Sequence, residues 1–61
     1  MPVITIAGNN GISEEKVKEM VAEVTEVVAK AYDLPESAIT ILVQGYPPEH
    51  IGVGGKVLND R

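Results

Sequence analysis

The 61-residue sequence contains no cysteine, phenylalanine or tryptophan, and it has a single histidine. Without cysteine the chain cannot form disulfide bonds or thiolate metal sites. The lone histidine, His50, does not make a metal site by itself, so we expect none. Tyr32 and Tyr46 are the only aromatic residues, and they are too few to predict a stacking platform for bases or sugars.

Basic residues are also scarce, with five Lys and Arg against nine Asp and Glu, for a net charge of −4. A surface that binds nucleic acid needs clustered basic side chains, and here they are scattered. No apolar run approaches the roughly 20 residues of a membrane helix. The first residues lack the charged segment and long apolar stretch of a signal peptide. We therefore expect a cytoplasmic protein that binds neither nucleic acid nor a membrane.

The length predicts one small domain over residues 1–61. A chain this short buries only about 60% of the surface that its unfolded form exposes, so a lone core is marginal. Small domains usually add disulfides, a metal or partner subunits. Because the composition removes the first two, oligomerisation is favoured by elimination.

The first half of the chain predicts a strand followed by a long helix. Residues 3–7 are rich in β-branched side chains and indicate a strand. The Gly-Asn-Asn-Gly stretch at 8–11 interrupts it. Ser13 is suited to cap a helix, and apolar residues then recur every three or four positions, which predicts a helix from about 14 to 32. Pro35 disfavours its continuation.

The second half predicts another strand over residues 38–44. Gly-Val-Gly-Gly at 52–55 indicates tight turns or a short hairpin, and the tail from residue 56 forms one short strand or stays mobile. A strand, a long helix and a strand in that order imply a βαβ unit whose parallel strands are joined by a right-handed crossover. The expected class is thus α+β, a single βαβ unit with a short C-terminal hairpin.

Alternation along the two strands leaves one apolar face without a cover. One face carries Ile4, Ile6, Ile39, Ile41 and Val43, and the helix can cover it. The opposite face carries Val3, Ala7, Ala38 and Leu42, interrupted by Thr5, Thr40 and Gln44. Because parallel sheets are normally buried on both sides, we expect another copy of the chain to supply the missing layer. The open strand edges offer a further place for copies to join.

Pro2 is the candidate for chemistry. Removal of Met1 would leave its ring nitrogen as a free secondary amine. A free α-amino group titrates near pH 7.7–8.0 in model peptides, and an apolar pocket lowers its pKa toward neutrality. Pro2 would then be a base poised for proton transfer. Met-Pro starts are common, however, and taken alone this feature more often has no catalytic meaning.

A set of features in register along the whole chain resembles the 4-oxalocrotonate tautomerase family: Pro2, Gly11, Ser13, the Asp33–Pro35 turn, His50 and the Gly52–Gly55 motif. The resemblance implies the tautomerase fold in a homo-oligomer, with a hexamer built as a trimer of dimers. It implies keto–enol tautomerisation of a 2-hydroxydienoate or 2-oxo acid by 1,3- or 1,5-proton transfer, as with 2-hydroxymuconate. Pro2 would be the general base and acid, and no metal or organic cofactor is implied.

The sequence departs from this family at two arginine positions, which are Ile12 and Thr40 here, and at an aromatic position, which is Ile51. The resemblance assigns those arginines to the substrate carboxylates and the developing enolate, for which a guanidinium is well suited. Either other groups replace them or the substrate carries fewer negative charges. The candidate replacements are Lys56, which is the first choice, Arg61, Tyr46 and the amides of Asn9 and Asn10.

Two functions are therefore compared. The first is a cofactor-independent isomerase that uses Pro2 on a small-molecule enol or 2-oxo acid. Its expected substrate-binding residues are Asn9, Asn10, Thr40, Tyr46, Ile51 and Lys56. The alternative is a non-catalytic oligomeric homologue that keeps the fold and acts as a scaffold or small-ligand binder, as the missing arginines would allow.

Overall fold

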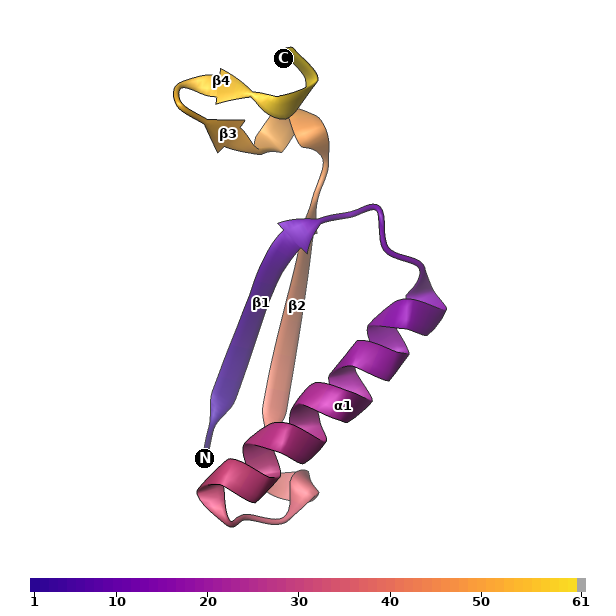
Figure 1. Cartoon of the computed structure of the whole chain (residues 1–61), viewed down its shortest axis with the longest axis vertical. Helices are drawn as coiled ribbons and strands as arrows, with labels where there is room; N and C mark the ends of the chain where they lie inside the picture. The colour runs from indigo at the N-terminus through magenta and orange to yellow at the C-terminus, as the bar shows by residue number, and fades with distance from the viewer. Residues whose placement is uncertain (61) are drawn as a thin grey trace.

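The computed structural model describes residues 1–60 and contains a βαβ unit followed by a small hairpin (Figure 1). In chain order the elements are β1 (Val3–Asn9), α1 (Glu14–Tyr32), β2 (Thr40–Tyr46), β3 (Gly52–Val53) and β4 (Lys56–Val57), with 3₁₀ turns at Glu36–Ala38, Pro48–His50 and Leu58–Asp60. Strands β1 and β2 are parallel, and β3 and β4 are antiparallel. The α+β class and the βαβ unit with a C-terminal hairpin are confirmed.

Helix α1 has the bounds that the sequence predicts, because both of its ends are capped. The side-chain hydroxyl of Ser13 accepts a hydrogen bond from the Lys16 amide at 3.2 Å. At the other end Asp33 adopts a left-handed conformation with φ of 56°. The amide of Asp33 donates to Lys30 and that of Leu34 donates to Ala29, the pattern of a Schellman cap. Within residues 1–60 no helix has the length and apolar character required to cross a membrane.

Strand β2 begins two residues later than predicted. The sequence predicts residues 38 and 39 in the strand, but Ala38 closes a 3₁₀ turn in which its amide donates to the Pro35 carbonyl at 3.0 Å. The amide of Ile39 likewise donates to the Glu36 carbonyl at 3.0 Å. These amides are therefore bonded inside the turn, and the ladder with β1 starts at Thr40.

The two faces of the sheet differ as the alternation predicts. Ile4 lies opposite Ile41 and Ile6 opposite Val43, and all four side chains are partly buried. Ala29 of α1, at 6% exposure, is the one buried residue within residues 1–60, and the other core side chains are only partly buried. On the other face Val3 remains 57% exposed and Leu42 47% exposed, even though both are large and apolar.

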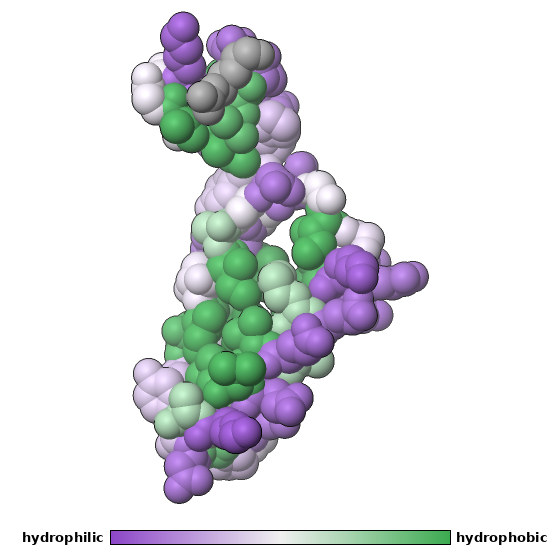
Figure 2. Space-filling model, in the orientation of Figure 1, coloured by the Kyte–Doolittle hydropathy of each residue, from purple (hydrophilic) through white to green (hydrophobic). Residues whose placement is uncertain are grey.

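A single chain is more open than a globular domain of its size. Its radius of gyration is 14.6 Å, whereas the scaling for compact domains gives about 10.5 Å for this length. Its accessible surface is 4724 Å², against about 3,800 Å² for a compact monomer of this mass. Figure 2 shows hydrophobic residues gathered at the surface over the strands and the adjoining flank of α1. The core of one chain is incomplete.

The C-terminal hairpin is held by backbone geometry. The turn between β3 and β4 contains Gly54 and Gly55, whose φ angles are 63° and 87°. Left-handed backbone of this kind disfavours any residue with a Cβ. The amide of Leu58 donates to the Ile51 carbonyl at 2.9 Å and ties the end of the hairpin back to its start.

Replacing Ser13 with alanine removes the oxygen that caps α1. We expect S13A to lower the free energy of unfolding by about 1 kcal/mol, as measured by urea unfolding at one fixed protein concentration. S13D is the matched control, because its carboxylate can accept the same bond at the positive end of the helix. Equal losses in S13A and S13D would contradict a capping role.

Replacing Gly55 with alanine places a Cβ on left-handed backbone, which costs roughly 1–2 kcal/mol. Hydrogen exchange of the Leu58 amide should then accelerate roughly 5–30-fold, because such a cost shifts the opening equilibrium by that factor. G52A is the control: Gly52 has no positive φ, and a Cβ there would meet only the Lys56 carbonyl oxygen at 3.8 Å. If G52A exchanged as fast as G55A, the conformational explanation would be wrong.

Candidate active site

The candidate site is a cleft of about 480 Å³ between the carboxyl end of the parallel strands and the C-terminal hairpin. Ligands of open α/β sheets bind outside the carboxyl ends of the strands, and this volume is within the usual range for ligand pockets. The lining residues come from the ends of β1 and β2 and from the hairpin region: Ala7, Gly8, Asn9, Tyr46, His50, Ile51, Gly52 and Leu58.

The ends of β1 and β2 are locked together at the cleft. Asn9 lies opposite Tyr46 in the strand register, and the Asn10 amide donates to the Tyr46 carbonyl at 3.0 Å. A side chain at Gly45 would place its Cβ 3.3 Å from Asn10, a contact that glycine avoids. The loop after β1 is therefore held tightly against the end of β2.

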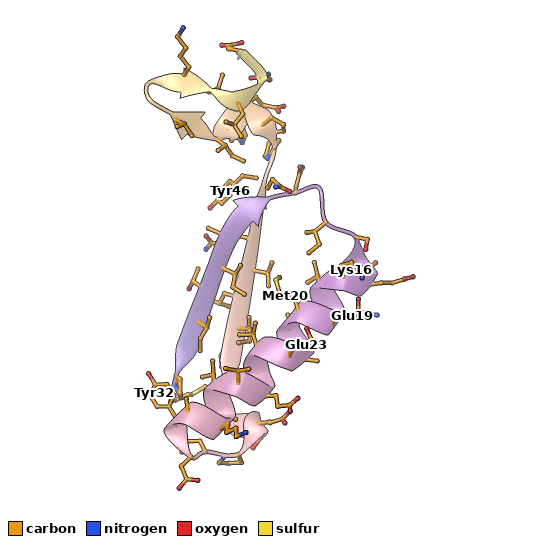
Figure 3. The ribbon with its side chains drawn as sticks, viewed as in Figure 1. Lys16, Glu19, Met20, Glu23, Tyr32 and Tyr46 are labelled. Carbon is orange, nitrogen blue, oxygen red and sulfur yellow. The ribbon has the colours of Figure 1, made fainter. Side chains whose placement is uncertain are left out.

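The polar side chains of the cleft are oriented by local hydrogen bonds. The Asn9 side-chain oxygen Oδ1 accepts a bond from the Gly11 amide at 2.9 Å. The Tyr46 hydroxyl donates to Oε1 of Gln44 at 3.2 Å, and Figure 3 shows Tyr46 beside the carboxyl end of the strands. The Asn9 amide NH₂ and the remaining lone pairs of the Tyr46 oxygen are left for other partners.

The structure gathers three of the expected substrate-binding residues at this cleft: Asn9, Tyr46 and Ile51. Asn10 adjoins it through its backbone bond to Tyr46. Lys56, the first choice as a replacement cation, lies on β4 with an exposed side chain and is not among the lining residues. Arg61 lies outside the described residues.

Sequence reasoning did not assign Ala7, Leu58 or His50 to the site. Leu58 reaches the cleft because the hairpin folds back and its amide bonds to Ile51. Two-residue strands such as β3 and β4 carry no periodic signal that would reveal this. His50 follows the Pro-Pro-Glu segment, and its amide donates to the Pro47 carbonyl at 2.9 Å, which closes the short turn that brings it to the cleft.

Pro2 and Thr40 lie at the other end of the sheet. The Thr40 amide donates to the Pro2 carbonyl at 3.1 Å, just before the first pair of the ladder. Pro2 is partly buried there. The seven residues of β1, at about 3.3 Å each, separate Pro2 from Asn9 by roughly 23 Å. One chain therefore does not bring Pro2 to the cleft.

Ile12, at one of the two arginine positions, lies on the helix side of the sheet and is 39% exposed. It lines a hollow of about 200 Å³ with Met20 and Asn9, and a shallow one of about 770 Å³ along α1. The second hollow contains the exposed ion pair of Lys16 with Glu19 at 3.3 Å (Figure 3). An exposed pair of this kind contributes little. Ile12 offers no hydrogen-bond donor from its side chain.

No cofactor or metal ligand set stands out in the described range. Within residues 1–60 no three His, Asp or Glu side chains are grouped so that they could hold a metal ion.

The chain matches the family model of the tautomerase enzymes over residues 2–61. A probable tautomerase of Staphylococcus aureus is 33% identical over 61 residues, covering the whole of both chains.

The solved structure of DmpI from Archaeoglobus fulgidus is 41% identical, with a TM-score of 0.87 over 97% of this chain and 100% of that one. A heterohexameric 4-oxalocrotonate tautomerase from Chloroflexus aurantiacus is 28% identical, with a TM-score of 0.90 over 98% and 97%. A full-length family match, a relative above 30% identity and shared folds all agree. The chain belongs to the tautomerase family, with homologues of 4-oxalocrotonate tautomerase as its structural neighbours, and is an isomerase.

Proposed function

We propose that this isomerase catalyses keto–enol tautomerisation of a 2-hydroxydienoate or 2-oxo acid, with Pro2 as the general base and acid after removal of Met1. The observation that carries the proposal is that the family match begins at residue 2, so that the family unit starts on the proline. A ring nitrogen that opens β1 is aimed by the strand that follows it.

The proposed reaction moves one proton. The Pro2 nitrogen takes the proton of the enol hydroxyl, so that the O–H bond breaks and an N–H bond forms. The electron pair left on oxygen makes the carbonyl, and the conjugated double bond shifts toward the distal carbon. The protonated nitrogen then returns its proton to that carbon. Electrons balance without an oxidant or reductant, and a positioned base of this kind typically contributes 10²–10⁴-fold.

The site is completed in our proposal by a second copy of the chain. In Figure 1 α1 runs obliquely from the β2 side of the sheet across its lower end, and within residues 1–60 strand β1 pairs only with β2, so its other edge is open. Unpaired strand edges bind other strands, and a two-fold axis pairs two β1 edges in antiparallel fashion. Such pairing places the beginning of one β1 beside the end of the other. Pro2 of one copy would then face the Asn9 cleft of its partner.

The open face of the sheet supports a larger assembly. Val3 and Leu42 are exposed there, and a face of this kind is normally buried. Dimers that stack these faces together would form the homohexamer, a trimer of dimers, that we propose. The relative from Chloroflexus aurantiacus is named as a heterohexamer.

The role of Pro2 is tested by blocking or replacing its nitrogen. We expect P2A, which keeps an amine but loses the ring, to slow turnover of phenylenolpyruvate by on the order of 10²-fold or more. Protein that retains Met1, verified by intact mass, should be inactive because its proline nitrogen is an amide. Undiminished turnover in both preparations would exclude Pro2 as the base, whereas absence of turnover by the unmodified protein would favour a scaffold or ligand-binding role.

The open face is tested by placing a charge on it. We expect L42E to dissociate the assembly in sedimentation at micromolar concentration, because a carboxylate would be buried without a partner. The apparent Tm of the unmodified chain should rise with protein concentration, since association stabilises the folded form. A22E is the matched control: Ala22 is an exposed position of α1, and the substitution adds the same charge. A compact, stable monomer of the unmodified chain would defeat the proposal of a homo-oligomer.

A further inference from the structure

We propose that Asn9 binds the carboxylate of the substrate and that the cleft selects acids with one carboxylate and an apolar remainder. This inference rests on the proposed function, because it assumes that tautomerisation takes place at this cleft. It names a binding residue and a substrate class that neither the family match nor the names of the relatives provide.

A local hydrogen bond sets the orientation of the Asn9 side-chain amide. An asparagine side chain can present either its oxygen or its nitrogen, and the bond from the Gly11 amide at 2.9 Å requires the oxygen. A Cβ at residue 11 would lie 3.2 Å from this same oxygen, so glycine leaves room for the bond. The nitrogen Nδ2 is thereby fixed as a donor of two hydrogens, with no acceptor for them within residues 1–60.

The rest of the lining is partly apolar and partly polar. Beside Asn9 the cleft is bounded by the apolar side chains of Ala7, Ile51 and Leu58. The polar lining side chains are those of Tyr46 and His50, and the Tyr46 hydroxyl proton is already engaged with Gln44. The cleft thus offers polar side chains at Asn9, Tyr46 and His50 beside an apolar wall formed by Ala7, Ile51 and Leu58.

The lining of the cleft has little positive charge. Among the described residues, no lysine lines the cleft. Lys16 is paired with Glu19 on α1, and Lys56 lies outside the lining on β4. A carboxylate that receives hydrogen bonds can be accommodated, whereas a second one against the apolar wall would lose its hydration without compensation. The lining that one chain supplies therefore favours a monoacid over a diacid.

The test compares N9D with the unmodified enzyme. Aspartate keeps an oxygen that can accept the Gly11 bond but replaces the NH₂ donor with a charged acceptor. We expect N9D to raise the KM for phenylenolpyruvate at least tenfold, while the enol of its uncharged methyl ester changes less than threefold. The unmodified enzyme should prefer phenylenolpyruvate to 2-hydroxymuconate at least tenfold in kcat/KM. N9L, which loses both bonds, should impair the acid and spare the ester in the same way.

Several results would overturn the inference. One is a KM of N9D for phenylenolpyruvate within twofold of that of the unmodified enzyme, and another is an equal loss of activity on the acid and the ester. A third is a preference of the unmodified enzyme for the diacid, which would point to a cation such as Arg61. A measurement without any variant follows the side-chain amide signals of Asn9 by NMR during titration with phenylpyruvate, and absent shifts would also reject it. P2A separates the two proposals: if P2A is inactive and N9D is unaffected, the carboxylate assignment alone fails.

Discussion

One helix can cover only one face of a two-stranded sheet, and the architecture of this protein depends on that constraint. Ala29 is buried, whereas Val3 and Leu42 stay exposed on the far face. The radius of gyration of 14.6 Å exceeds the value for a compact domain because a sheet and one helix cannot enclose a core. In our proposal, further copies of the same chain supply the missing apolar cover. Folding and assembly would then be linked.

The direction and length of β1 determine how far apart the two candidate functional residues lie. The strand carries Pro2 at its start and Asn9 at its end, so a single chain holds a candidate base and a candidate binding residue apart. A two-fold axis would convert this separation into proximity. The resemblance to the 4-oxalocrotonate tautomerase family implies arginines at the positions of Ile12 and Thr40, whereas the donor that we propose at the cleft is the neutral amide of Asn9. Such a change alters which acids are tolerated more than it alters proton transfer itself.

Much of the fold was determined by the sequence alone. The bounds of α1 follow from the Ser13 cap and from the left-handed turn at Asp33 that precedes Pro35, all of which act over a few residues. The assignment of Ile4 and Ile6 to the covered face follows from the two-residue period of a strand. The resemblance to the tautomerase family was also readable, because its motifs lie in register along the chain. Local capping and periodicity suffice for these features.

Other features were decided only by the tertiary structure. Leu58 joins the lining of the cleft because its amide bonds to Ile51 and closes the hairpin beyond the strand ends, a contact without any periodic signal. The same folding leaves Lys56 outside the lining, although its charge had made it the first choice. The orientation of the Asn9 amide depends on the Gly11 bond. Sequence spacing encodes local turns, but the pairing of β1 with β2 and the position of the hairpin beyond the strand ends determine which side chains share a cleft.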